Sequence, residues 1–414
     1  MLLVSVVSGR SQDALRNALS VDTVLAQPPP STLTPTPDRP HLGPVQVSAG
    51  LYAGFEFNDN INGSQLDPKA DVLLRGGTSL ALAWPATERS ELQFDAGLGY
   101  LHYWSHPEYG GLEVTPNSAL VWEIGLPDGT LSFYDQLSYA EQVSQEATIA
   151  NVVTLPRLDN VIGARLDWEP GPWVVEGSYG HDTYFSPQSA YQYLNHSSEY
   201  FFARGGRKLA DVTQFGLEAS ATLTAYDLSY QSDNRSLSAG AYLEWQVTQN
   251  LHASLRAGPT IYQFTSSGAA GPQPDLRSYY LVFNVSDTLT SFLSQQLSLE
   301  REVSLGLNLG GGYVEQLTAS YALSLALTSH IHLGANVAYE QGNQPLLFPV
   351  TGFPGLLISE VENYNRAGWG ATIAWDFTDH FSTSVHYGFW RRESSLPGLG
   401  YTQNSIALQV TYTF

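Results

Sequence analysis

Hydrophobic and polar residues alternate along this chain from about residue 44 to its last residue. The last ten residues, SIALQVTYTF, show the pattern most clearly: on one side of an extended chain they place Ile406, Leu408, Val410, Tyr412 and Phe414. The residues between them are Ser, Ala, Gln or Thr. Because successive side chains of a strand point to opposite faces, this stretch is predicted to be a strand with one apolar and one polar face.

The same alternation recurs in eighteen segments, each long enough to cross a bilayer as a tilted strand of about 9–11 residues. We place the predicted strands at 44–57, 70–84, 89–104, 113–125, 129–140, 157–168, 172–185, 196–208, 212–227, 234–247, 250–264, 275–287, 291–304, 314–328, 330–341, 362–377, 380–392 and 403–414.

The connections between these segments alternate in length. Eight short turns, such as PATER and LPDG, alternate with nine longer loops, such as NDNINGSQLDPK. Bacterial outer-membrane barrels have short periplasmic turns and long extracellular loops. The sequence therefore predicts an all-β fold, a transmembrane antiparallel up-and-down β-barrel of about 18 strands with both termini in the periplasm. Sixteen strands is the next alternative.

Charged residues test this assignment, because a charge on the lipid-facing side of a barrel is unfavourable. In the predicted strands nearly all charges fall on the side opposite the apolar residues. Asp135 and Arg301 are exceptions, since the alternation places both on the lipid side. We expect them either to lie near a rim or to be turned inward by a bulge.

Composition agrees with an exported membrane barrel. Only 14% of residues are charged, 12% are aromatic, Cys is absent, and the net charge is −21. The absence of Cys excludes thiolate metal sites, disulfides and Cys nucleophiles. The acidic charge argues against nucleic acid as a partner. No apolar stretch is long enough for a transmembrane helix.

The chain divides into three parts. We interpret 1–26 as an atypical or mis-assigned signal segment, because Arg10, Asp13 and Arg16 interrupt its apolar run. Residues 27–43 include QPPPSTLTPTPDRP and are expected to form a Pro/Thr-rich linker. The barrel is expected to occupy 44–414, in the outer membrane of a Gram-negative-type bacterium and in contact with outer-membrane lipid.

Charged residues on the inward side form a predicted pore lining with more acids than bases. Such a lining favours cations, and the alternative is that the charges pair across strands and only fill the interior. The inward charges are Glu56, Arg75, Asp95, Glu123, Asp159, Arg165, Asp167, Glu176, Asp182, Arg204, Glu218, Glu244, Arg256, Glu300, Glu302, Glu340, Arg366, Asp376 and Arg392.

Aromatic residues on the inward side could form a track for sugars, whose rings stack on aromatic faces. The alternative is that many of them belong to the interfacial girdles at the strand ends. These residues are Tyr52, Tyr103, Tyr134, Tyr184, Phe202, Tyr226, Tyr242, Tyr262, Tyr280, Tyr364 and Trp390.

Two loops are candidates to restrict the lumen: 141–156, which is long, and 342–361, which contains PLLFPVTGFPGLL and is unusually apolar. An exposed apolar loop is unfavourable unless it packs against something. We expect it either to enter the lumen, to contact a partner or to pack against neighbouring loops. No arrangement of residues predicts a catalytic site, a metal site or a cofactor, so we predict that the chain is not an enzyme.

The start of the barrel, VSAGLYAGFEFNDNINGSQLDPKADVLLRGGTSLAL, resembles the outer-membrane β-barrel porins associated with exopolysaccharide operons. The resemblance rests on a Gly/aromatic strand, an acidic DNI loop, Lys69 and Asp71 in a K-x-D step, and a Gly-Thr-Ser-Leu strand. It implies an outer-membrane passage for secreted polysaccharide, working with a periplasmic polysaccharide-export partner.

The last strand resembles the carboxy-terminal strands of outer-membrane barrels, which the barrel assembly machinery recognises; here Tyr412 and Phe414 would be the assembly signal. The sequence therefore predicts an outer-membrane pore for secreted polysaccharide. The alternatives are a diffusion porin for small solutes with cation preference and a plugged barrel that acts as a scaffold or anchor. A barrel hydrolase is the remaining alternative.

Overall fold

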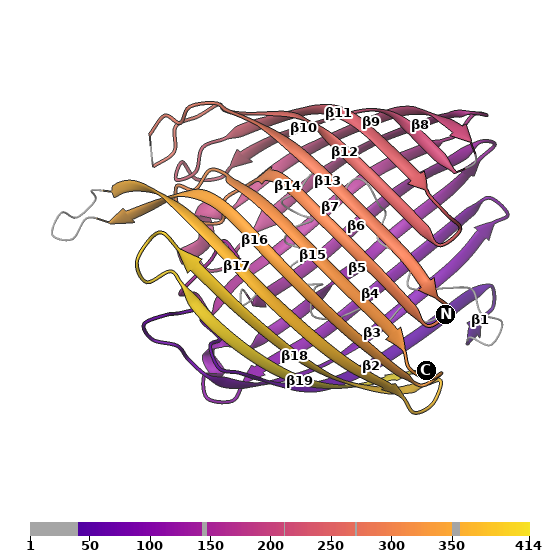
Figure 1. Ribbon diagram of the computed structural model, residues 1–414, viewed down its shortest axis with the longest axis horizontal. Coiled ribbons are helices and arrows are strands. Elements are labelled where there is room, and N and C mark those ends of the chain that lie inside the picture. Colours follow the sequence, from indigo (N-terminus) through magenta and orange to yellow (C-terminus); the bar gives the residue numbers. More distant parts are fainter. Residues whose placement is uncertain (1–39, 143–146, 211, 270, 350–356) are drawn as a thin grey trace.

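The computed structural model describes residues 40–142, 147–210, 212–269, 271–349 and 357–414. Within these residues, eighteen long strands form one tilted antiparallel sheet (Figure 1). They are β2 (Val45–Asn58), β3 (Asp71–Thr87), β4 (Ser90–Tyr103), β5 (Gly111–Leu126), β6 (Gly129–Gln142), β7 (Thr154–Trp168), β8 (Trp173–Phe185), β9 (His196–Ala210), β10 (Thr213–Tyr226), β11 (Asn234–Gln246), β12 (Leu251–Phe264), β13 (Leu276–Thr290), β14 (Leu293–Ser304), β15 (Val314–Ala326), β16 (Ile331–Pro349), β17 (Leu357–Asp376), β18 (Phe381–Ser394) and β19 (Tyr401–Thr413).

The sheet closes on itself. Each long strand pairs with the next one in the sequence, and β19 pairs antiparallel with β2 from Ser405↔Asn58 to Thr413↔Gly50. A two-residue strand, β1 (His41–Leu42), adds a small hairpin at the start of β2. Because every long strand has two partners, the described barrel wall has no edge strand. At the loop end, β16 and β17 have a strand partner on one side alone at 344–349 and 357–363.

The outer face of the barrel is apolar along its middle and aromatic at its ends. Leu98, Ile162, Leu217, Val337 and Ile373 are all more than half exposed. Exposed aromatic residues mark the end with the short turns: Trp168, Trp173, Trp245, Trp375 and Phe414. At the other end they include Trp104, Phe185 and Tyr279. An apolar belt between two aromatic girdles is the outer surface of a barrel that spans a bilayer.

The predicted strands are confirmed, all eighteen of them, as is the alternation of short turns and long loops. The prediction that differs most from the structure is the loop assigned to the apolar segment 342–361. The structure continues β16 to Pro349 and starts β17 at Leu357, and the two strands stay in register out to these residues. Figure 1 shows this hairpin reaching beyond the neighbouring strands. Residues 350–356 lie outside the described part of the chain.

The two exceptional charges behave differently. Arg301 lies near the loop end of β14, where it stacks 3.8 Å from the ring centroid of Tyr279 and bonds Glu315 at 3.1 Å. That is the predicted rim position. Asp135 lies in the middle of β6, pairs with the outward-facing Leu120 and Ile162, and is exposed. For Asp135, both the rim and the bulge predictions were wrong.

Two smaller points complete the fold. Within the predicted linker 27–43, His41 and Leu42 form β1, and the residues up to 39 lie outside the described part. In the residues that the structure describes, no helix has the length and apolar character needed to cross a membrane.

Candidate functional site in the lumen

The inward face of the barrel carries the predicted site residues. In each strand, the exposed apolar residues mark the lipid-facing side. All nineteen charged residues and all eleven aromatic residues predicted to face inward alternate with them and so lie on the side away from lipid. The structure brings many of them into two groups on opposite sides of the barrel. One lies on β7–β12 and the other on β16–β18.

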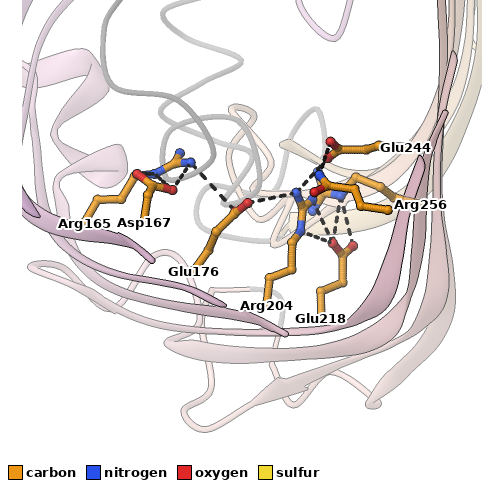
Figure 2. A network of polar contacts seen from close by, with 8 residues as sticks. Arg165, Asp167, Glu176, Arg204, Glu218, Glu244 and Arg256 are labelled. Atoms are coloured by element: carbon orange, nitrogen blue, oxygen red, sulfur yellow. Dashed lines mark hydrogen bonds and ion pairs between the residues drawn. The ribbon is translucent and has the colours of Figure 1, made fainter. Parts of the chain in front are cut away.

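The first group, which we call the wall network, consists of acids and arginines on neighbouring strands (Figure 2). Four members are successive register partners, in the order Asp167, Glu176, Arg204 and Glu218. The charged residues labelled in Figure 2, which we take as the wall network, are Arg165, Asp167, Glu176, Arg204, Glu218, Glu244 and Arg256.

Arg204 is the centre of the wall network. Its guanidinium donates to Glu218 at 3.0 Å and to Glu244 at 3.0 Å, and lies 3.5 Å from Glu176. It also lies 4.3 Å from the ring centroid of Tyr242. Glu218 in turn accepts from Arg256 at 3.0 Å. The positive charges of this wall are therefore held in fixed positions by several partners each.

The exposed members of the wall network are mainly its acids. The side chains of Asp167 and Glu244 are 34% and 30% exposed, whereas those of Arg204 and Arg256 are 7% and 12% exposed. The guanidinium groups lie beneath, against aromatic rings and carboxylates. Because three arginines face four acids, the network is net negative, and its accessible surface is more acidic than that count alone indicates.

The second group, which we call the buried ion pairs, lies on the opposite wall. Arg366 bonds Glu340 at 2.8 Å, and Arg392 bonds Glu362 at 2.8 Å. All four side chains are almost completely buried. Arg366 and Arg392 are direct register partners, so the two acids are needed to neutralise two adjacent positive charges.

The described part of the third loop between β6 and β7, residues 147–153, crosses the lumen and contacts this second wall. The carbonyl of Ala147 accepts from Arg392 Nε at 2.7 Å. The carbonyl of Thr148 accepts from Gln344 at 2.8 Å and from Asn308 at 2.9 Å. Since β7 and β16 are nine strands apart in an eighteen-stranded barrel, the loop reaches from one side of the lumen to the other.

Apolar side chains fix the third loop at three further places. Ile149 packs in a buried cluster with Leu155, Tyr184, Leu194 and Leu307. Val153 packs with Ile61, Leu73, Leu101 and Tyr103, and Ala147 packs with Val314 and Tyr364. Tyr193, which lies between β8 and β9, packs against the cluster that contains Ile149, and burial raises its pKa to about 12. The loop is thus a packed part of the interior that narrows the lumen.

Several residues of this site were not predicted from the sequence. Gln344 was assigned to the apolar loop 342–361, and Glu362, the first residue of the predicted strand 362–377, was not among the inward charges, so their place in the second wall was missed. No pattern in the sequence indicated Asn308 as a residue of this site, because its partner Thr148 is 160 residues away. A continued alternation through QGNQPLLF, visible once the prolines are accepted in a strand, would have placed Gln344 on the inward face.

No metal centre accompanies these charges. Among the residues that the structure describes, no group of three or more His, Asp or Glu side chains is arranged to hold a metal ion. The inward histidines instead have other partners: His332 pairs with Asp376 at 3.2 Å, and His386 bonds Thr372 at 2.9 Å.

A closed antiparallel barrel with an apolar, aromatic-girdled outer face and a charged inner face is an outer-membrane β-barrel. The described part of the loop between β6 and β7 contacts the opposite wall across its lumen.

No protein-family model and no curated protein matches the chain. Among solved structures, it is similar to OccAB3 of Acinetobacter baumannii, with a TM-score of 0.47 and 9% identity over 89% of this chain and 99% of that one. It is also similar to OccK2 (OpdF) of Pseudomonas aeruginosa in complex with glucuronate, with a TM-score of 0.48 and 9% identity over 89% and 98% of the two chains. For OpdK of Pseudomonas aeruginosa with vanillate, the TM-score is 0.48 and the identity is 8%, over 89% of this chain and 99% of that one. All three TM-scores are below 0.5, so the assignment as an outer-membrane β-barrel rests on the strand pairing of this chain and on its apolar outer face and charged inner face.

Proposed function

We propose that the chain is an outer-membrane pore for small hydrophilic solutes, with a preference for cations. The observation that carries the proposal is the arrangement of the wall network, whose exposed members are carboxylates while its guanidinium groups lie beneath. Acidic side chains that line a narrow aqueous path raise the local concentration of cations and disfavour anions. The crossing third loop supports a small size limit for the solute.

Passage of secreted polysaccharide, the first expectation from the sequence, has weaker support. Stacking of sugars requires aromatic faces that are open to the lumen. Eight of the eleven predicted inward aromatics are instead buried: Tyr103, Tyr134, Tyr184, Phe202, Tyr242, Tyr262, Tyr280 and Tyr364. A loop packed across the lumen also obstructs a long polymer. The periplasmic export partner belonged to that expectation and is not part of the present proposal.

Single-channel recording in planar bilayers tests the proposal, with the reversal potential measured across a salt gradient. We expect a steady conductance with a reversal potential of the cation-selective sign, unchanged by added oligosaccharide. Absence of any conductance would favour the plugged scaffold. A conductance blocked by long oligosaccharides would instead favour polysaccharide passage.

Removing the exposed acids of the wall network should reduce the cation preference. In the double variant Asp167→Asn with Glu244→Gln, the reversal potential is expected to move toward zero, because the arginines beneath lose part of their neutralisation. The matched control is Glu393→Gln, which removes an exposed acid on the outward side of β18. An equal shift in both proteins would place the selectivity outside the lumen.

We also propose that the end with the short turns faces the periplasm, where β2 begins and β19 ends. The last residue, Phe414, is exposed, packs against Tyr412 with ring centroids 4.8 Å apart, and donates its N–H to Ala49 at 2.8 Å. These two outward aromatics are accessible for recognition by the barrel assembly machinery.

Deleting Phe414 should lower the amount of barrel that reaches the outer membrane severalfold, because the terminal aromatic is the proposed recognition element. The measurement is the fraction of heat-modifiable, folded protein in purified outer membranes. Phe381→Ala is the control, since it removes an exposed aromatic from the strand next to β19. Normal assembly without Phe414 would show that this residue is no signal.

A further inference from the structure

Asp135 is a carboxylate on the lipid-facing side of the barrel, in the middle of its strand. Its register partners Leu120 and Ile162 are exposed apolar residues, and so are Phe133 and Leu137 on the same face of β6. The register shifts on either side of β6 lie away from Asp135, between Val114 and Ser118 and between Ala140 and Gln142. Lipid can neither hydrate nor hydrogen-bond this carboxylate.

Asp135 belongs to a continuous group of outward polar residues on four neighbouring strands, β6–β9. We call this group the lipid-facing patch, and its members are Asp135, Asn160, Tyr179, His181, Thr183 and Glu199. Asn160 donates to Asp135 at 2.6 Å. Glu199 bonds His181 at 2.8 Å and accepts from Tyr179 at 2.6 Å. The patch therefore lies within the apolar belt at Asp135 and reaches the aromatic girdle at Thr183, which is the outward neighbour of Phe185 on β8.

The chemistry of the lipid-facing patch is self-complementary. Two carboxylates, Asp135 and Glu199, provide acceptors, and within one chain they accept from Asn160 and Tyr179, so these bonds can be exchanged for bonds between two copies. Large apolar side chains lie between and around them: Ile162 lies between Asp135 and His181, and Leu137 and Phe201 lie beside the patch. Polar groups that hydrogen-bond across a contact between membrane segments hold such segments together.

We propose that the lipid-facing patch is the contact surface for a second copy of this chain, in a two-fold symmetric dimer within the membrane. A two-fold contact brings the same patch of both copies together, so that donors of one copy can face acceptors of the other. The surrounding apolar side chains then form the rim of the contact. The patch lies outside the lumen, so this proposal is independent of what the pore conducts.

Thiol cross-linking tests the contact directly, because the chain has no Cys of its own. Ile162 lies at the centre of the patch, as the register partner of both Asp135 and His181, and is 51% exposed. Val337 is 52% exposed on β16, on the opposite side of the barrel. With a short bifunctional thiol reagent in native outer membranes, we expect a covalent dimer from Ile162→Cys and none from Val337→Cys.

The role of the polar pair is tested by adding Asp135→Leu and Asn160→Leu to the Ile162→Cys variant. We expect the cross-linked dimer to decrease severalfold while the barrel stays folded, as judged by heat modifiability, and while its single-channel conductance is unchanged. Native mass spectrometry of the purified wild-type chain should give the dimer mass.

Three results would overturn the proposal. The first is a wild-type chain that is monomeric with no cross-linked product. The second is a cross-linked product that contains a different protein, which would make the patch a surface for another partner. The third is a dimer whose amount does not change in the Asp135→Leu, Asn160→Leu variant, since the polar pair would then not hold the contact.

Discussion

Deleting residues 147–152 is expected to raise the single-channel conductance severalfold. This stretch of the third loop carries the carbonyls that Arg392, Gln344 and Asn308 hold, and the side chain of Ile149 that packs into a buried cluster. Its removal would enlarge the open cross-section of the lumen at the level where the loop crosses it. The measurement is the conductance of the folded variant in planar bilayers under the conditions used for the wild type.

A milder variant distinguishes an effect of the crossing loop on conductance from the effect of a general loss of structure. Gln344→Ala with Asn308→Ala removes both side-chain donors to Thr148 but leaves the loop in place, so a smaller increase with more frequent current fluctuations is expected. If the deletion folds and conducts as the wild type does, then the third loop does not limit the pore, and the narrowest part lies elsewhere along the wall.

Replacing Arg366 with Leu should destabilise the barrel by about 3–5 kcal/mol, because it leaves Glu340 buried and unpaired. The measurement is the midpoint of urea unfolding of the barrel in lipid vesicles, followed by tryptophan fluorescence. The double variant Arg366→Leu with Glu340→Leu should recover most of the loss, since no uncompensated charge remains inside.

The outward pair on β18 provides the matched control for this prediction. Arg391 bonds Glu393 at 2.6 Å, but both side chains are more than 60% exposed. Arg391→Leu should therefore change stability by no more than about 1 kcal/mol. Equal effects of Arg366→Leu and Arg391→Leu would mean that water reaches the buried pair, which would contradict the burial described for the second wall.

The strands and their faces were predictable from the sequence because lipid and water impose opposite demands on alternate residues. Ile406 and Leu408 face lipid while Gln409 and Thr411 face the lumen, and this requirement repeats in every strand. It is local, so a few residues suffice to read it. The same rule failed at β16, where Pro345 and Pro349 indicated a loop, although both lie in the strand pair with β17.

The interior of the lumen could not be predicted in the same way, because it depends on contacts between distant parts of the chain. Arg392 meets Ala147 across 245 residues, and Gln344 meets Thr148 across 196 residues. Alternation placed Tyr364 and Tyr242 on the inward face but could not indicate that loops and arginines would cover them. Asp135 was recognised as an exception, yet only the register excluded a bulge at its position.

The closing seam between β19 and β2 has a consequence for how the barrel forms. All other long strands pair with a neighbour in the sequence, so their contacts are local, whereas Thr413 pairs with Gly50 across almost the whole chain. Loop closure of this length is slow. Until it occurs, the sheet has two free edges, β2 and β19, each able to pair with another chain. The time spent as an open sheet is therefore the period of greatest risk for aggregation, and a factor that holds β19 during that period would protect one of the two edges.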